Sequence, residues 1–410
     1  MQALVYHLSL PKVLMARLLA ARRPGLVTGP GSPLQLTDMP APELRGDDWA
    51  VLATRLAGIC GTDLGLLTGQ SSPSASPFNS FPAVLGHEVV ATIREAGSRV
   101  PYPPGTRVVV DPGISCTMRG LDPPCPACRE GFPYLCRRCT EGALAPAIII
   151  GFNRDLPGGW GEMMAAHAGQ LFPVPEEMSD ERAVLVEPLA VAVHAVLRRK
   201  PQPGSRVLVI GAGTIGLCTV AALRLLEVDC HITLAARYSF QAELGRSLGA
   251  DQIIDGRGDG LLHAAADQPW SSLHKPVMGR PVLRGGFDMV YDCVGSRSSL
   301  DDALRVTAEG GTMVLVGGAG DVGGLDWTFV WLRELSIIGS AGYGMEKPGG
   351  EPIHTFQLTM DRMMARPDLP VERMITHRFP LAEYRSALTA ALGRRSSRAI
   401  KVVFDYRQSG

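Results

Sequence analysis

The sequence predicts two domains, one mostly β and one α/β with a doubly wound parallel sheet. Its 410 residues exceed a single ordinary domain of roughly 100–200 residues. The first third holds short runs of strand composition broken by proline-rich turns, such as VVAT at 89–92 and RVVV at 107–110. From about residue 180, apolar strands alternate with helical patterns, which indicates a parallel sheet covered by helices on both faces.

The composition favours a globular protein whose partner is a small molecule. Hydrophobic residues make up 46% of the chain and charged residues 20%, which excludes a disordered chain. The 40 Lys and Arg residues balance the 40 Asp and Glu residues, so the chain lacks the global field that attracts nucleic acid or an anionic membrane. No stretch reaches the roughly 18 consecutive apolar residues that span a bilayer. We therefore expect a cytoplasmic protein.

The part before residue 200 adds one strand, one loop and one helix. Alternating apolar residues from Ala50 to Leu56 predict the strand, and the Ser- and Pro-rich segment 70–82 is expected to be a surface loop. The segment SDERAVLVEPLAVAVHAVLRRK at 179–200 has a capping signal, an acidic first turn, helical apolar spacing and a basic end. These features predict one helix with a kink at Pro188.

The α/β part follows as alternating patterns. Strands are predicted in RVLVIGAG, CHITLAA, FDMVYDCVG and GTMVLVGG, and helices in TIGLCTVAALRLL, SFQAELGRSLGA and LDDALRVTA. The Gly-, Pro- and Asp-rich segment 256–285 is a longer connection than such a sheet usually needs. After Ser340 the chain ends with EPIHTFQLTMDRMMAR, SALTAALGRR and the strand-like AIKVVFDY.

The segment VLVIGAGTIG carries three glycines at G-x-G-x-x-G spacing, after a predicted strand and at the start of a predicted helix. Gly211 allows a tight turn, Gly213 lets the backbone approach a pyrophosphate, and Gly216 lets helix and strand pack closely. Thr214 and Ile215 lie within this turn, where N–H groups at the helix start meet the phosphates. A bare glycine motif is often only a turn, but this context favours dinucleotide binding.

The end of the second α/β strand bears on the choice of cofactor. An NAD-binding domain has an acidic residue about 20 residues after the glycine turn, which binds the ribose hydroxyls. Here the strand ends in Ala235, Ala236 and Arg237. With no carboxylate to repel a 2′-phosphate and a guanidinium to pair with it, NADP is favoured over NAD. The alternative is that Arg237 is a solvated surface residue and that the cofactor choice is loose.

Five of the nine cysteines crowd one short Gly- and Pro-rich segment. In a reducing cytosol this crowding indicates a metal before disulfides. Thiolates on an irregular loop can close a tetrahedral zinc site, which predicts a structural zinc held by Cys116, Cys125, Cys128 and Cys136. Cys139 is a spare that could replace Cys116. The alternative is a set of unpaired small hydrophobes.

A second candidate metal site is dispersed along the chain. It comprises Cys60 in GICGTD, His87 and Glu88 in GHE, and Glu187 in VEP. Thiolate, imidazole and carboxylate ligands, with one position left to water or substrate, make a catalytic zinc site. Taken singly, each residue has an ordinary alternative as a core cysteine, a hydrogen-bonded turn histidine or a surface acid.

Several segments of the chain occur in an order typical of one family: ALVYH, GICGTD, VLGHEVVATIREAGSRV, the cysteine-rich segment, VLVIGAGTIG, LGAD, ITHRFPLAEYRSAL and AIKVVF. On these segments the chain resembles the zinc-dependent medium-chain dehydrogenase/reductase superfamily, which includes alcohol, polyol, glucose and threonine dehydrogenases, over nearly its whole length.

The resemblance implies a domain arrangement. A GroES-like, mostly β catalytic domain would comprise residues 1–190 and 341–410, with a structural zinc lobe at about 112–140. A Rossmann nucleotide-binding domain would comprise residues 191–340, with the active site in the cleft. The resemblance also implies a homodimer or homotetramer.

The resemblance also implies roles for single residues. Cys60 and His87 match catalytic zinc ligands, and Glu88 and Glu187 match the carboxylates that alternate or share at the metal in the polyol and threonine branches. Thr62 matches the hydroxyl residue that passes the substrate proton.

Three departures from the family pattern concern the active site. Many relatives have a histidine five positions after the ligand cysteine, where this chain has Gly65, so water or another residue must complete the proton path. Extra segments around 12–32 and at 70–82 exceed the usual pattern and are expected to shape the cleft.

We therefore expect a zinc-dependent oxidoreductase that transfers a hydride between NADP(H) and a secondary alcohol or ketone. Zinc would polarise the substrate oxygen while Thr62 relays its proton. By resemblance, GHE together with VEP favours a polar substrate such as a polyol, sugar, aminocyclitol or hydroxy amino acid.

Three other functions would each account for part of the sequence. A zinc-free reductase of the same superfamily would lack the GHE and cysteine-rich motifs. A non-catalytic nucleotide-sensing zinc protein would bind about one zinc per chain instead of two. A nucleic-acid-binding zinc protein is suggested by Arg129, Arg137 and Arg138, but zero net charge opposes it.

Overall fold

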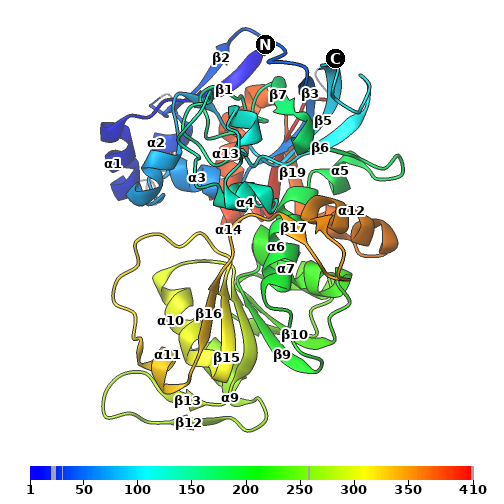
Figure 1. Ribbon diagram of the computed structural model, residues 1–410. Helices are drawn as coiled ribbons and strands as arrows, with labels where there is room; N and C mark the ends of the chain where they lie inside the picture. The colour runs from blue at the N-terminus through cyan, green and yellow to red at the C-terminus, as the bar shows by residue number, and fades with distance from the viewer. Residues whose placement is uncertain (20–24, 30, 257–258, 408–410) are drawn as a thin grey trace. The chain divides into compact units, whose positions relative to one another are not determined.

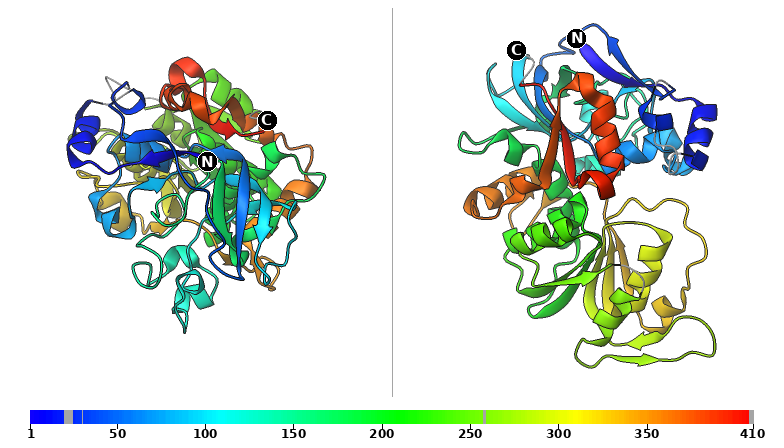
Figure 2. Two further views of the ribbon diagram at one scale, coloured as in Figure 1. Left: turned by 90° about the horizontal axis from the view of Figure 1, so that it is seen from above. Right: turned by 180° about the vertical axis from the view of Figure 1, so that it is seen from behind.

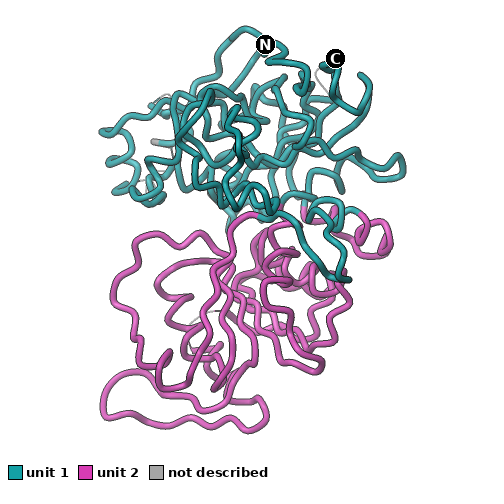
Figure 3. The backbone as a smooth tube through the Cα atoms, in the orientation of Figure 1, with its two compact units in different colours: residues 1–187, 343–360, 375–410 teal, residues 188–342, 361–374 magenta. Residues whose placement is uncertain are grey.

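The chain folds into two compact units, which Figure 3 colours separately. The structure is a computed structural model that describes residues 1–19, 25–29, 31–256 and 259–407. Unit 1 comprises Met1–Glu187, Tyr343–Met360 and Ile375–Gly410, and unit 2 comprises Pro188–Gly342 and Asp361–Met374. Both ends of the chain therefore fold into unit 1. Residues 361–374, which the predicted boundaries gave to the catalytic domain, group with unit 2.

The main sheet of unit 1 has seven strands among the described residues. Its order is β19-β20-β3-β5-β6-β8, and β7 also pairs with β3. The strands are β3 (Trp49–Gly58), β5 (Val89–Ala96), β6 (Arg107–Val110), β7 (Met163–His167), β8 (Leu171–Pro173), β19 (Ile375–Phe379) and β20 (Lys401–Asp405). The predicted strands at 50–56, 89–92 and 107–110 all lie in it. Apolar side chains such as Leu52, Ile93 and Val108 are buried on it and form one core cluster.

A smaller sheet and several helices complete unit 1 (Figure 1). The sheet has the order β2-β1-β4, from β1 (Gln2–Tyr6), β2 (Leu34–Asp38) and β4 (Ala83–Val84). The helices are α1 (Leu10–Leu19), α2 (Gly25–Thr28), α3 (Gly61–Leu67), α4 (Pro126–Arg129), α5 (Asp180–Ala183), α13 (Tyr384–Leu392) and α14 (Arg394–Ser397). A hairpin of β17 (Met345–Glu346) and β18 (Ile353–His354) precedes α12 (Thr355–Ala365).

The two extra segments contain helices that the sequence analysis did not predict. The segment around 12–32 contains most of α1 and all of α2, while residues 20–24 and 30 of it lie outside the described residues. The Ser- and Pro-rich segment contains the 3-10 helix η1 (Pro73–Phe78), so its assignment as a loop was incomplete. The Ser72 side chain caps η1 by accepting a hydrogen bond from the Ser74 N–H. No residue of η1 is buried, which agrees with the expected surface position.

The helix predicted over 179–200 is two helices, α5 and α6 (Val186–Arg198). Ser179 caps α5 by accepting a hydrogen bond from the Arg182 N–H. The chain leaves the helix at residues 184–185 and resumes at Val186. Pro188 is the third residue of α6, where a backbone N–H has no intrahelical partner to lose. The predicted kink at Pro188 is therefore wrong, because the proline lies in the first turn of a new helix.

Unit 2 is built on a parallel sheet of six strands among its described residues, in the order β11-β10-β9-β14-β15-β16. The strands are β9 (Ser205–Ile210), β10 (Cys230–Ala236), β11 (Gln252–Asp255), β14 (Phe287–Asp292), β15 (Thr307–Leu315) and β16 (Ser336–Gly339). The order reverses between β9 and β14, which is the switch point of a doubly wound sheet. The predicted fold class, an α/β parallel-sheet domain joined to a mostly β domain, is confirmed.

Helices lie on both faces of the unit 2 sheet (Figures 1 and 2). They are α7 (Thr214–Leu225), α8 (Ser239–Ser247), α9 (Gly260–Ala266), α10 (Arg297–Val306) and α11 (Thr328–Leu332). The contacts group α7 with α8, and α10 with α9 and α11. The long connection at 256–285 contains α9 and a hairpin of β12 (Ser272–His274) and β13 (Val282–Arg284), and its residues 257–258 lie outside the described residues.

Within the described ranges, no helix is both long enough and apolar enough to cross a membrane.

Asp180, the first residue of α5, is buried among three arginines. Its carboxylate accepts hydrogen bonds from Arg55 Nε at 2.8 Å, Arg107 Nη1 at 3.0 Å and Arg407 Nη1 at 3.2 Å. Burial raises the pKa of this carboxyl, but the bonds from Arg55 and Arg107 outweigh burial and hold the pKa below its usual value. Asp180 therefore ties α5 to β3 and β6 of the main sheet.

We predict that Asp180→Asn destabilises the chain by about 1–3 kcal/mol, because three arginines lose a charged acceptor. The melting temperature should fall by roughly 2–10 °C at pH 7. Since the folded pKa is lowered, this stabilisation is present at neutral pH and is lost as the pH falls through the folded pKa, so the difference should shrink below about pH 4. Thermal melts across pH provide the measurement.

The control for Asp180→Asn is Asp48→Asn. In the unchanged chain, the exposed Asp48 carboxylate pairs with Arg99 Nε at 2.7 Å. Water screens that exposed pair, so its melting temperature should change less. An equal loss in the two variants, or a loss at Asp180 that persists unchanged in acid, would contradict the assignment.

Candidate active site and metal centres

The glycine turn lies at the switch point of the unit 2 sheet. Gly211 follows β9 with a φ of +96°, a conformation that residues with side chains rarely adopt. Gly213 is the N-cap of α7. A Cβ on Gly216 would lie 1.7 Å from the Gly211 carbonyl oxygen, so strand and helix meet with no space for a side chain. The first-turn N–H groups of α7, which have no intrahelical acceptor, are available to an anion.

Arg237 lies at the same edge of the sheet as the glycine turn. It follows β10, whose Ala235 pairs with Ile210 of β9, so both strands end side by side. Arg237 is exposed, and the two residues before it are buried alanines. A carboxylate at this position would repel the 2′-phosphate of NADP. This chain has the guanidinium of Arg237 there instead.

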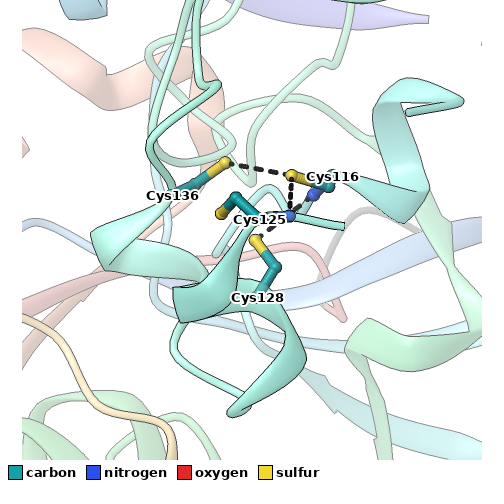
Figure 4. A group of neighbouring side chains, drawn as sticks. All are labelled: Cys116, Cys125, Cys128 and Cys136. Carbon is teal, nitrogen blue, oxygen red and sulfur yellow. Dashed lines mark hydrogen bonds between the residues drawn. The ribbon is translucent and has the colours of Figure 1, made fainter. Parts of the chain in front are cut away.

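Four cysteines converge in the cysteine-rich lobe, as Figure 4 shows. The sulfur atoms of Cys116, Cys125, Cys128 and Cys136 all lie within 4.8 Å of one another. Backbone N–H groups point at these sulfurs: the Cys125 N–H donates to Cys116 Sγ at 3.4 Å, and the Cys116 N–H donates to Cys128 Sγ at 3.4 Å. Such N–H groups stabilise thiolates, and four thiolates at this spacing suit a tetrahedral zinc ion.

The titration of Cys125 agrees with a thiolate site. Burial raises the pKa of its thiol, but the Cys128 and Arg137 N–H groups and the neighbouring thiols outweigh burial and lower the pKa to about 6. One thiol of the set is thus stabilised as a thiolate, whereas burial raises the pKa of Cys128 and raises that of Cys136 to about 11.

Cys139 is not a member of this four-cysteine set. Its side chain is buried, and burial raises the pKa of its thiol. The neighbouring Arg119, which is 1% exposed, donates to the carbonyl oxygens of Leu144 at 3.0 Å and Ala145 at 3.2 Å. Between the two alternatives that the sequence left open, the geometry therefore favours Cys116.

In the dispersed set, Asp63 organises Cys60 and His87. Cys60 is the N-cap of α3, and its N–H donates to Asp63 Oδ2 at 2.9 Å. The other oxygen, Asp63 Oδ1, lies 3.5 Å from His87 Nδ1. A carboxylate behind one ring nitrogen is the usual support of a metal-binding histidine, and it leaves Nε2 for the metal. The Cys60 side chain also lies close enough to His87 to raise the pKa of its imidazole.

His87 is buried, which opposes a charged ring. Asp63 and Cys60 outweigh this burial and raise the pKa of the imidazole. The negative charge of these neighbours favours a cation at this position, and the imidazole must lose its proton before it can bind a metal.

Glu88 is engaged by a buried lysine. Both of its carboxylate oxygens accept hydrogen bonds from Lys401 Nζ of β20, with the Oε1 bond at 2.7 Å. Gly58 makes this possible, because a Cβ there would lie 1.8 Å from Glu88 Oε2. The carboxylate is therefore part of an ion pair that a metal would have to displace.

Glu187 lies in the first turn of α6 and is buried. Its Oε1 accepts a hydrogen bond from the Tyr343 hydroxyl at 3.1 Å. Burial raises its pKa to about 7, while the nearby His87 acts in the opposite direction. Glu187 and His87 are thus electrostatic neighbours. Within the described residues, however, the four-cysteine set is the only group that brings all its ligand atoms within 4.8 Å of one another.

Thr62 lies beside the candidate ligand cysteine, with its Oγ1 3.6 Å from Cys60 Sγ. Thr62 is exposed, so a substrate can reach its hydroxyl. At Gly65, where the sequence departs from the expected histidine, a Cβ would lie 3.5 Å from the Ser71 hydroxyl oxygen. Ser71 thus offers a hydroxyl close to the missing imidazole, which the sequence analysis did not anticipate.

Lys401 and Tyr343 also contact the candidate ligands and were not predicted from the sequence. Lys401 had a signal, since a lysine within the apolar run AIKVVF is expected to need a buried partner. Tyr343 had none, because its partner Glu187 is 156 positions away.

Comparison with known proteins supports one class. Residues 214–363 match the zinc-binding dehydrogenase family, and residues 46–176 match the alcohol dehydrogenase GroES-like domain. The chain therefore belongs to the zinc-dependent medium-chain dehydrogenase superfamily, which confirms the predicted resemblance, and it is an oxidoreductase of the alcohol dehydrogenase type.

Three individual relatives illustrate this similarity. D-arabinitol dehydrogenase 1 of Uromyces fabae is 30% identical over 345 residues, covering 83% of this chain and 86% of the relative. L-threonine 3-dehydrogenase of Chromobacterium violaceum is 28% identical over 384 residues, covering 93% and 98%. A structure from Sinorhizobium meliloti 1021, described as a zinc-binding dehydrogenase bound to NADP, is 27% identical with a TM-score of 0.69, covering 91% and 96%.

We predict that Cys116→Ser removes one zinc ion per chain, whereas Cys139→Ser removes none. A hydroxyl is a much poorer zinc ligand than a thiolate. Of these two cysteines, Cys116 belongs to the four-cysteine set and Cys139 does not. Elemental analysis of the purified variants provides the measurement, with thermal melts to follow folding. Zinc loss in Cys139→Ser together with retention in Cys116→Ser would reverse the assignment.

Proposed function

We propose that this protein is a zinc-dependent oxidoreductase that transfers a hydride between NADP(H) and a polar secondary alcohol or its ketone. The observation that carries the proposal is the arrangement of the buried Asp63 and His87 with the partly exposed Cys60, near Glu187. Asp63 contacts both the Cys60 N–H and the His87 ring, and Glu187 lies near enough to His87 to affect its charge, which supports a shared metal for these three side chains.

Cys60, His87 and Glu187 are the proposed ligands of a catalytic zinc ion, and Cys116, Cys125, Cys128 and Cys136 those of a structural one. The catalytic ion, when bound, acts as a Lewis acid on the substrate oxygen and lowers the pKa of the alcohol. Glu88 remains beside the site in its ion pair with Lys401, where it balances the charge of the lysine. This choice ranks Glu187 above Glu88 as the direct ligand.

Thr62 is the proposed carrier of the substrate proton. Its exposed hydroxyl accepts the proton of the alcohol at Oγ1 as it passes its own proton on. Gly65 has no side chain to receive that proton, so the outer path runs through water or the Ser71 hydroxyl near Gly65.

The glycine turn is the proposed seat of the cofactor pyrophosphate, and Arg237 pairs with the 2′-phosphate of NADP. The nicotinamide carries the hydride, while the protein binds and orients the cofactor. The NADP-bound relative from Sinorhizobium meliloti supports this choice.

The names of the relatives support a polar substrate. They include D-arabinitol and L-threonine dehydrogenases, which suits a polyol, sugar, aminocyclitol or hydroxy amino acid. A reducing, cytoplasmic setting is supported by nine cysteines that are all free of disulfides. A homodimer or homotetramer completes the proposal.

Cys60→Ala should abolish turnover, by at least about 1,000-fold in kcat, because a protein ligand of the Lewis acid is lost. Binding of NADPH, measured by fluorescence titration, should stay within about threefold, since the glycine turn lies in unit 2. Activity is assayed on a panel of polyols, sugars and hydroxy amino acids, with zinc quantified on the same samples.

Cys230→Ala, which alters a buried cysteine in β10, serves as the control for Cys60 and should keep turnover. Full activity of Cys60→Ala, or of a wild-type preparation free of metal, would refute the proposed mechanism.

Arg237→Ala should lower kcat/KM for NADPH by about 10–100-fold, because a charge-assisted bond to the 2′-phosphate is lost. The value for NADH should change little, since NADH has no such phosphate. The control is Arg246→Ala, which removes an exposed arginine near the end of α8. Equal losses with both cofactors would show that Arg237 does not read the phosphate.

A further inference from the structure

We propose that Tyr134 and Tyr343 are positioning residues, which form a hydrogen-bond chain from the cysteine-rich lobe to Glu187 and hold its carboxylate in place for the metal. This inference rests on the proposed function, because it assigns a metal to Glu187. The hydrogen bond between Tyr134 and Tyr343 would link the two proposed metal centres, and neither tyrosine belongs to the cysteine, GHE or VEP motifs.

The chain has two bonds that run in one direction. The Tyr134 hydroxyl donates to the Tyr343 hydroxyl at 2.6 Å, and the Tyr343 hydroxyl donates to Glu187 Oε1 at 3.1 Å. Each hydroxyl thus donates toward the carboxylate, and the first bond polarises the second. The Tyr343 hydroxyl engages Oε1 of Glu187 and leaves Oε2 without this donor. The two tyrosines therefore determine which carboxylate oxygen faces the metal.

Packing holds both rings in these positions. The Tyr134 and Tyr343 rings meet edge to face with centroids 4.8 Å apart, and Phe356 packs on Tyr343 at 4.9 Å. Tyr343 is 1% exposed. The hydroxyl of Tyr343 therefore has little freedom to swing away from Glu187.

The backbone around Tyr343 is fitted to the lobe. A Cβ on Gly131 would lie 2.2 Å from Met345 Cγ, and a Cβ on Gly344 would lie 2.4 Å from the Gly131 carbonyl oxygen. The two segments thus touch through glycines, close enough for Tyr134 to reach Tyr343.

Tyr134 is fixed by the lobe that carries it. It lies in η3 (Pro133–Leu135), directly before Cys136, whose N–H donates to the Pro133 carbonyl at 3.0 Å. Binding of an ion by the four cysteines would therefore fix the position of Tyr134. Through its hydrogen bond to Tyr343, Tyr134 would in turn restrain the carboxylate of Glu187. An ordinary core role for the tyrosines would stabilise the fold but leave the metal at Glu187 unaffected.

The test compares Tyr134→Phe, Tyr343→Phe and the double variant with Tyr406→Phe. Each change removes a hydroxyl and keeps the ring. Tyr406 is the matched control, because its hydroxyl also makes a hydrogen bond in unit 1, which is partly buried and goes to the Gly159 carbonyl at 2.8 Å and not to Tyr134 or Tyr343. Cobalt(II) is exchanged into the full chain, and its affinity is measured by competition with a chelator.

Cobalt(II) reports on the two centres separately, since a four-thiolate site and a mixed thiolate, imidazole and carboxylate site absorb differently. We expect Tyr343→Phe to weaken the mixed site by about 10-fold or more and to shift its spectrum, as loss of a ligand's supporting bond does. Tyr134→Phe should weaken it less, and the double variant should match Tyr343→Phe, because the bonds act in series. The four-thiolate spectrum should not change.

Two results would overturn the inference: tyrosine variants that match Tyr406→Phe in affinity and spectrum, or additive effects of the two tyrosines. If Tyr343→Phe fails to fold, as thermal melts would show, the comparison of Tyr134→Phe with Tyr406→Phe decides the question. Failure of the proposed function gives a different result, because the wild type would then bind cobalt(II) at the four-thiolate site alone.

Discussion

The candidate active site depends on one buried carboxylate. Asp63 has no exposed surface, accepts the Cys60 N–H at the start of α3 and faces His87 Nδ1 across 3.5 Å. Without it, the first turn of α3 would lose its acceptor and His87 would lose the group that fixes its ring. The thiol and the imidazole come from separate segments, so a shared support is what brings them together. Asp63 touches no substrate in this scheme, yet it sets the geometry that Thr62 and Cys60 use.

The two acids near this centre differ in how their charge is balanced. Glu88 is neutralised by Lys401, whereas Glu187 accepts its hydrogen bond from the neutral Tyr343 hydroxyl and has a pKa raised by burial to about 7. A buried carboxylate in that state gains most from a divalent cation. This difference between two neighbouring acids explains why we rank Glu187 first, although the sequence gives both the same standing.

Local features could be predicted from the sequence, and long-range ones could not. The glycine turn, the strands of unit 2 and the spacing of the four cysteines are written in contiguous segments, where period and spacing determine the outcome. The helix break before Pro188 was missed because an unbroken helical pattern does not reveal where tertiary packing ends a helix. The pairs Lys401–Glu88 and Tyr343–Glu187 join residues 313 and 156 positions apart, and no local pattern encodes such a meeting.

The fit at Gly216 restricts how this gene can vary. Every missense change of a glycine codon adds at least a Cβ, and at this position that atom would lie 1.7 Å from a backbone carbonyl oxygen that cannot move aside like a flexible side chain. Even the smallest replacement, alanine, must therefore push strand and helix apart. Natural variants of this protein should consequently keep glycine at this position, with only synonymous changes of its codon, even where neighbouring surface positions vary freely.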